Sequence, residues 1–154
     1  MVEIIESIDR FEDFCRRASQ KPYVTIDTEF LRERTYYPKL CLIQIAFPGS
    51  GSDNASIIDV QSPKINLNPL YNLFKNPDVT KVFHSARQDL EIFFSDSRIF
   101  PKPFFDTQIA AMVCGFGEQV AYETLVRKIL SIDLDKSSRF TDWSQRPLSE
   151  EQIN

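Results

Sequence analysis

The stretch that decides the fold is YVTIDTEF, residues 23–30, in which an apolar and β-branched run ends in two acids. Such a run predicts a β-strand. Because side chains alternate between the two faces of a strand, Asp27 and Glu29 are expected on one face, ~6.5 Å apart along the backbone. The opposite face is then expected to carry Val24, Ile26 and Thr28.

Two carboxylates on one face of a buried-looking strand repel each other and resist desolvation. A cation between Asp27 and Glu29 would relieve both effects, and carboxylate oxygens suit Mg²⁺ or Mn²⁺. The same residues are compatible with a strand that ends at a solvated loop and carries two ordinary surface acids. This stretch alone therefore leaves a metal site and a plain surface as alternatives.

The composition predicts one globular domain and no membrane span. The chain has 154 residues, of which 42% are apolar and 26% charged, as in ordinary globular proteins. Its net charge of −4 argues against a protein that coats nucleic acid by bulk charge, but not against a nuclease whose metal ions offset carboxylate charge. The acidic start is unlike a signal peptide, and no apolar run approaches the ~20 residues of a membrane helix.

Three cysteines, Cys15, Cys41 and Cys114, lie far apart in the chain and form no CxxC pair. An odd number of dispersed cysteines favours reduced thiols over a disulfide or zinc framework. The cysteine pattern and the composition therefore predict a cytoplasmic protein with no membrane partner.

Turn residues and apolar periodicity divide the chain into strands and helices. Strands joined by short links are expected at 23–30, 40–47 and 55–60, and they predict an antiparallel meander. Further strands are expected at 81–84 and 104–105, and helices at 7–19, 67–74, 86–94, 107–114 and 122–130. A meander followed by alternating strands and helices predicts an α/β domain with a mixed sheet flanked by helices, the ribonuclease H-like pattern.

A second acidic motif, HSARQDLEIF at 84–93, lies where an expected strand gives way to a helix. Asp89 falls toward the polar side of the first helical turns. An acid at that position is favoured by the helix dipole, which is a sufficient structural explanation. Alternatively, Asp89 is a third metal ligand that a neighbouring element presents to Asp27 and Glu29.

Six stretches together resemble the ribonuclease D family, a bacterial member of the DEDD superfamily of 3′→5′ exonucleases. They occur in family order over almost the whole chain: DTEF at 27–30, RTYYP at 34–38, CLIQI at 41–45, HSARQDL at 84–90, FDTQ at 105–108 and DWSQRPL at 142–148. The resemblance implies a ribonuclease H-like fold. It also implies release of 5′-nucleotides from RNA 3′ ends, such as those of tRNA precursors, by two-metal-ion hydrolysis with Mg²⁺ or Mn²⁺.

The resemblance also implies roles for individual residues. Asp27 and Glu29 match the first exonuclease motif and Asp89 the second, so all three are implied catalytic metal ligands. The third motif, a tyrosine followed by the fourth acid, is expected to begin after residue 154. Residues 1–154 are therefore expected to be a C-terminally incomplete exonuclease domain without the family's helical C-terminal domain. Two alternatives stay open: a proofreading-type DNA exonuclease, and a fragment that binds nucleic acid without catalysis.

His84 and Asp89 also spell H-x-x-x-x-D, which resembles the third motif of the superfamily's histidine branch and would make His84 the general base. The separation of Asp89 from Asp27 suits the second motif better. A third-motif interpretation would leave only Asp53 or Asp59 for the second motif, and neither opens an expected helix. We therefore expect His84 to be a packing or substrate-side residue.

Several side chains near these motifs are candidates for contact with nucleic acid. Aromatic rings stack on bases, and basic or polar groups bind phosphates. The candidates are Thr28, Phe30, Tyr36, His84, Gln88 and Arg146. Structural alternatives apply: Arg146, together with Trp143, is also expected to anchor the polar tail, and Asp106 is expected to cap a helix.

Overall fold

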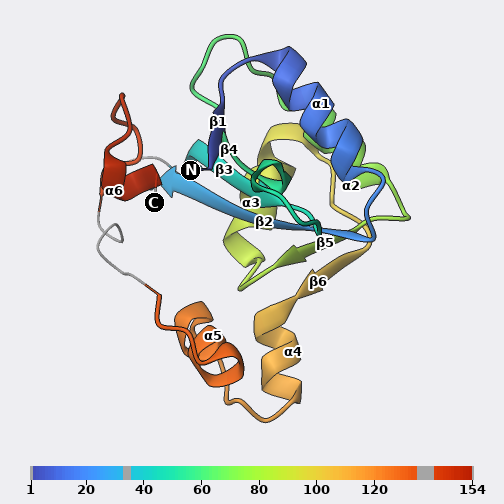
Figure 1. The fold of residues 1–154 in the computed structure, drawn as a ribbon, viewed down its shortest axis with the longest axis vertical. Coiled ribbons are helices and arrows are strands. Elements are labelled where there is room, and N and C mark those ends of the chain that lie inside the picture. Colours follow the sequence, from blue (N-terminus) through green and yellow to red (C-terminus); the bar gives the residue numbers. More distant parts are fainter. Residues whose placement is uncertain (1, 33–35, 135–140, 154) are drawn as a thin grey trace.

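The computed structural model describes residues 2–32, 36–134 and 141–153, and its centre is a six-stranded sheet in the order β1-β4-β3-β2-β5-β6 (Figure 1). The strands are β1 (Glu3–Ile5), β2 (Tyr23–Leu31), β3 (Lys39–Ala46), β4 (Ala55–Asp59), β5 (Thr80–Phe83) and β6 (Phe104–Asp106). The helices are α1 (Ile8–Ala18), the short 3₁₀ helix η1 (Ser52–Asn54), α2 (Asn68–Lys75), α3 (Arg87–Ser97), α4 (Thr107–Val113), α5 (Tyr122–Leu130) and α6 (Glu150–Ile153).

The sheet is mixed, as the sequence predicted. β2, β3 and β4 form the expected antiparallel meander. β5 pairs in parallel with β2, and β6 pairs in parallel with β5, so the second half of the chain adds an α/β pattern to the meander. The sequence did not indicate β1, which pairs in parallel with β4, because three residues are too few to show an alternating pattern.

The main core lies on the sheet face that is covered by α1, α2 and α3. Helix α1 contributes a stripe of apolar residues at helical spacing, including Phe11 and Phe14, and both of these rings are fully buried. β2 contributes Val24 and Ile26, whose side chains alternate with outward-facing ones. The sheet and helices complete this cluster with Ile43, Ile45, Ile58, Leu70, Leu73, Phe74, Phe83 and Phe93.

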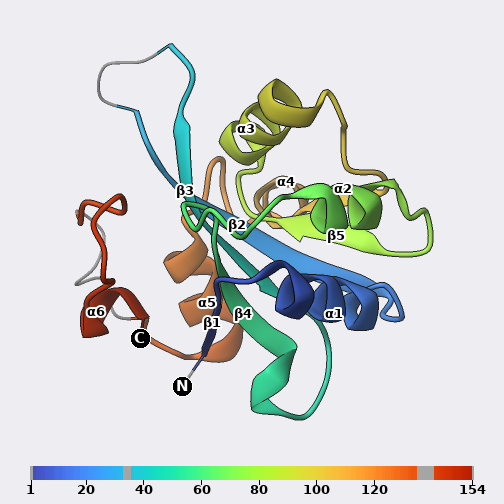
Figure 2. The ribbon, with the colours of Figure 1, turned by 90° about the horizontal axis from the view of Figure 1, so that it is seen from above.

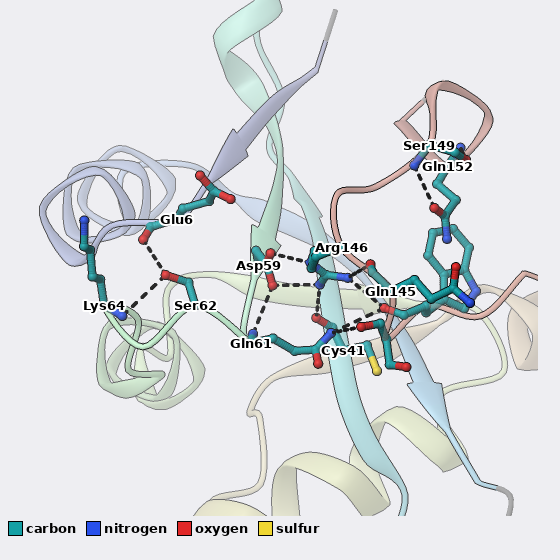
Figure 3. A network of polar contacts seen from close by, with 12 residues as sticks. Glu6, Cys41, Asp59, Gln61, Ser62, Lys64, Gln145, Arg146, Ser149 and Gln152 are labelled. Atoms are coloured by element: carbon teal, nitrogen blue, oxygen red, sulfur yellow. Dashed lines mark hydrogen bonds and ion pairs between the residues drawn. The ribbon is translucent and has the colours of Figure 1, made fainter.

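A second cluster anchors the tail that precedes α6. Trp143 is buried beside Leu42 and Ile57, at the start of the turn that carries Arg146. The Arg146 guanidinium forms a two-pronged ion pair with Asp59 at the end of β4, with Nε–Oδ2 and Nη2–Oδ1 distances of 2.6 and 2.7 Å (Figure 3). The expectation that Trp143 and Arg146 hold the tail on the body of the protein is confirmed.

Helices α4 and α5 pack on each other through a small cluster of their own, below the sheet in Figure 1. Ala111, Val120 and Leu125 are buried there, with Phe116 packed against them. The sequence predicted both helices nearly to the residue. No helix in the three described ranges is long and apolar enough to span a membrane.

Lys81 on β5 is a buried cation that has no carboxylate partner among the residues that the structure describes. Its side chain is fully buried, and its Nζ donates to the carbonyl oxygens of Asn76, Val79 and Lys102 at 2.6, 2.7 and 2.8 Å. Burial lowers the pKa of Lys81 to about 8. All three ammonium donors are satisfied, so Lys81 joins two loops beneath the β5–β6 edge of the sheet.

We predict that Lys81→Met lowers the free energy of unfolding by about 2–4 kcal/mol, because three buried carbonyl groups lose a charged donor. Urea unfolding monitored by circular dichroism measures the change. Lys75→Met, an exposed lysine on α2, is the matched control and is expected to change stability by less than about 0.5 kcal/mol. Equal stability of the two variants would contradict the assigned role of Lys81.

Candidate metal and nucleic-acid site

Strand β2 divides its side chains between two environments. Val24, Ile26 and Thr28 are buried, whereas Asp27 is exposed and Glu29 is half-buried. The alternation expected from the sequence therefore holds along the strand. A bulge between Glu29 and Phe30 interrupts the pairing with β3 directly after the second acid.

The surroundings of the two acids disfavour their ionised forms. Desolvation raises the pKa of Asp27, while the backbone N–H of Thr28 and, to a smaller extent, His84 act in the opposite direction. Desolvation, followed by the charges of Asp27 and Asp89, raises the pKa of Glu29 from 4.5 to about 7. Glu29 thus interacts electrostatically with both other acids of the predicted site.

Asp89 lies in the first turn of α3 and is buried, with 6% of its surface exposed. The Thr28 hydroxyl donates to Oδ1 of Asp89 at 2.5 Å. Desolvation raises the pKa of Asp89 to about 6, with Thr28 lowering it and Asp27 raising it further. The second motif therefore contacts the first through Thr28, the residue between Asp27 and Glu29.

Thr28 lies on β2 between the two acids, so its hydrogen bond brings Asp89 to the part of the strand that carries them. The charges of Asp27 and Asp89 both raise the pKa of Glu29, so the three carboxylates lie within electrostatic reach of one another. Their role as shared metal ligands stays a prediction. Among the described residues, no three His, Cys, Asp or Glu side chains are arranged to hold an ion. The donors nevertheless fit a hard divalent cation, because three mutually repelling carboxylates are the groups that such an ion stabilises.

His84 follows β5, and both of its ring nitrogens bind protein groups. Nε2 lies 3.0 Å from the carbonyl oxygen of Val120, and Nδ1 lies 2.9 Å from the hydroxyl of Thr107. The ring also meets Tyr122 edge-on. With both nitrogens engaged in this way, His84 is a packing residue that ties α4 and α5 to the sheet, and this geometry does not favour a general base.

The other predicted contact residues differ in how open they are. Tyr36 is 81% exposed and stands edge-on to Tyr37. Both residues lie in the chain between β2 and β3, and Figure 2 shows the ends of these two strands projecting beyond the helices. Gln88 is exposed next to Asp89, and Phe30 is half-buried on β2. Thr28 is buried and already holds Asp89. Residues 34 and 35 of the RTYYP stretch lie outside the described part of the chain.

Arg146 is a poor candidate for a phosphate contact. Besides its ion pair with Asp59, its Nη1 donates to the carbonyl oxygens of Trp143 and Gln145 at 2.9 and 2.7 Å, and its Nη2 donates to that of Cys41 at 3.3 Å. The guanidinium is thus engaged within the protein (Figure 3). We therefore replace the expected phosphate contact with a structural role, which the sequence alone could not distinguish from it.

Two residues near the site were not assigned to it from the sequence. Gln44 on β3 pairs directly with Asp27 and shares its face, which explains a polar residue within an apolar strand. Asp106 was expected to cap a helix, and its carboxylate does accept from the Gln108 N–H at 2.8 Å. It also accepts from two N–H groups in the turn before α3, and no local sequence signal indicates those contacts.

Comparison with known proteins identifies relatives along the whole chain. A family model described as 3′–5′ exonuclease matches residues 2–154. The chain is 59% identical to the ribonuclease D of Jannaschia sp. (strain CCS1) over 152 residues, which cover 99% of this chain and 39% of that protein. The chain therefore spans about two fifths of the length of this relative.

Solved structures agree with this similarity. Escherichia coli RNase D, an exoribonuclease involved in structured RNA processing, matches with a TM-score of 0.91 at 35% identity, over 99% of this chain and 40% of that one. Brucella melitensis NrnC with bound Mg²⁺ matches with a TM-score of 0.74 at 26% identity, over 98% of this chain and 68% of that one. Both similarities include the elements that carry Asp27, Glu29 and Asp89.

We predict that Glu29 makes the protein less stable as the pH rises. Its pKa is about 7 in the folded protein and 4.5 ordinarily, so between these values the folded state binds a proton that the unfolded chain does not. Stability should therefore fall from about pH 4.5 to about pH 7. Glu29→Gln cannot ionise, and it should reduce this decline and stabilise the metal-free protein at about pH 8.

Urea unfolding at about pH 5 and about pH 8, in the presence of a chelator, measures this effect. Glu12→Gln, which changes an exposed acid on α1, is the control and should keep the full decline. If the free energy of unfolding of Glu29→Gln fell with pH as much as that of the original protein, the environment of Glu29 would not disfavour its charge.

Proposed function

This chain belongs to the 3′–5′ exonuclease family, and on that basis we propose that it removes nucleotides one at a time from RNA 3′ ends. The observation that carries the proposal is the placement of its acids. Asp27 and Glu29 lie on the open face of β2, and Asp89 reaches the same strand through Thr28. The match to proteins named ribonuclease D favours RNA over DNA as the substrate.

We propose that Asp27, Glu29 and Asp89 hold Mg²⁺ or Mn²⁺, two ions in the complete site. When bound, the ions supply an activated water and stabilise the departing 3′-oxygen. The carboxylates contribute negative charge that is held in place before any ion arrives, and the raised pKa values of Glu29 and Asp89 reflect the cost of that arrangement. Gln44, beside Asp27, is placed to orient that carboxylate.

The substrate we propose is a structured RNA with a single-stranded 3′ tail, of the tRNA-precursor type, from which 5′-nucleotides are released. The three cysteines are free thiols, as expected for a protein that acts in the reducing cytoplasm. We also propose that the fourth acid and the tyrosine of the family's third motif come from sequence outside residues 1–154. A proofreading-type DNA exonuclease is the second candidate, because a shared fold does not by itself decide which nucleic acid is cut.

We predict that Asp27→Ala lowers the rate of RNA trimming by roughly 10²-fold or more. The variant removes a metal ligand, and a reacting group that is displaced by ~1 Å can slow a reaction by about this factor. The assay uses the full-length protein, which supplies the third motif, and follows a 5′-labelled RNA with a single-stranded 3′ tail in Mn²⁺, with a DNA of equal sequence in parallel. Asp78→Ala, an exposed loop acid, is the control and should trim normally. Trimming that is indifferent to Asp27→Ala would refute this site, and faster DNA trimming would favour the second candidate.

We predict that Tyr36→Ala raises KM for RNA by roughly 5–150-fold with little change in kcat, because stacking contributes about 1–3 kcal/mol per base. Tyr36 is 81% exposed, so its removal should leave the unfolding midpoint unchanged. Tyr23→Ala, at the opposite end of β2, serves as the control. An unchanged KM in Tyr36→Ala would remove this residue from the RNA path.

A further inference from the structure

Helix α3 begins without a cap from its own sequence. Its N-cap residue is Ala86, which has no side-chain group that can accept a hydrogen bond. The residue before it, Ser85, has a φ of 60°, a left-handed backbone conformation that residues other than glycine rarely adopt. The turn between β5 and α3 therefore needs an outside group to hold it in place.

The carboxylate of Asp106, at the end of β6, is that group. Its Oδ1 accepts from the N–H of Ser85 at 3.0 Å, and its Oδ2 accepts from the N–H of Ala86 at 2.9 Å. Oδ1 also accepts from Gln108, so one carboxylate caps α4 and holds the start of α3. Burial alone would raise the pKa of Asp106, but these backbone donors lower it, which keeps the acceptor ionised.

The next residue strengthens this clamp from the same side. The Thr107 hydroxyl lies 3.0 Å from the carbonyl oxygen of Phe83 and 2.9 Å from Nδ1 of His84. β6 is an edge strand whose Asp106 pairs with Phe83 in the sheet. Residues 83–86 are thus held by two consecutive side chains, Asp106 at the end of β6 and Thr107 at the start of α4.

The clamped turn leads directly to Asp89. The first helical hydrogen bond of α3 runs from the N–H of Leu90 to the carbonyl oxygen of Ala86, at 2.9 Å. Asp89 lies within this first turn and meets Thr28 on β2. The direction in which α3 starts therefore decides whether the Asp89 carboxylate reaches the strand that carries the other two acids.

We propose that Asp106 is a positioning residue for the nuclease site: by holding Ser85 in its left-handed conformation, it sets the first turn of α3 and so the place of Asp89. The inference rests on the proposed function for its kinetic consequence only. Its structural consequence, an ordered start of α3, is measurable without any substrate.

The experiment compares Asp106→Asn, Ser85→Gly and the double variant with the original protein. An amide offers one acceptor oxygen and two donors, so Asp106→Asn cannot hold the N–H groups of Ser85 and Ala86 together. Glycine adopts a positive φ without a steric penalty, so Ser85→Gly should restore the turn when the clamp is lost. Asp142→Asn is the matched control, because Asp142 also accepts a backbone N–H, from Ser144, in the tail that precedes α6.

Two readouts are used, both well below the unfolding midpoint of each variant. Amide hydrogen exchange at Leu90 reports the first turn of α3. We expect it to be faster in Asp106→Asn by roughly 10-fold or more and to recover in the double variant. Trimming of RNA is measured with the full-length protein, and kcat should be roughly 10²-fold lower in Asp106→Asn with KM little changed, whereas most of kcat should return in the double variant.

The outcomes separate this inference from the proposed function. Normal exchange at Leu90 in Asp106→Asn, or a loss that Ser85→Gly does not repair, would reduce Asp106 to a cap of α4 and overturn the inference. If the full-length protein and all of its variants leave the RNA uncut, the proposed function fails, and the exchange data still decide the role of Asp106. Recovery of both exchange and kcat in the double variant supports the inference.

Discussion

The alternation of side chains along β2 is the constraint on which the rest of the structure depends. One face of the strand must be apolar enough to pack against α1, α2 and α3, while the other presents carboxylates. Thr28 is the polar exception on the buried face. A buried hydroxyl without a hydrogen-bond partner would destabilise the fold, and the Thr28 hydroxyl finds its partner in Asp89. This hydrogen bond links the two acidic motifs.

The acids of this sheet show how a partner decides the state of a buried carboxylate. Glu29, Leu42 and Asp59 form a row across β2, β3 and β4. Burial tends to raise the pKa of both acids. For Asp59 the hydrogen bonds from Arg146 and from the Gln61 backbone, together with the charge of Arg146, outweigh burial and lower its pKa. For Glu29 the charges of two further acids add to burial and raise its pKa. At one end of the row Asp59 is neutralised by Arg146. At the other end Glu29 lies near two further acids, and a bound metal ion would stabilise these like charges.

Much of this arrangement follows from local sequence patterns. The strand 23–30, the meander and the helices α4 and α5 were predictable because their periodicity and turn residues are strong. Strand β1 was not predictable, since its pairing with β4 depends on the completed sheet. The same limit applies to side chains: the meeting of Asp89 with Thr28, the capture of Arg146 by Asp59 and the three donors of Asp106 are contacts between distant segments. Residue types and spacing predict which side chains carry charge, but only the fold decides which of them are already paired.

The binding of Mn²⁺ to the protein, measured by electron paramagnetic resonance of the free ion, tests the central claim most directly. If the acids of β2 form the metal site, Asp27→Asn and Glu29→Gln will each weaken Mn²⁺ binding by roughly 10-fold or more, while Asp78→Asn will leave it unchanged. Mn²⁺ affinity that is equal in the original protein and in both β2 variants would contradict the account.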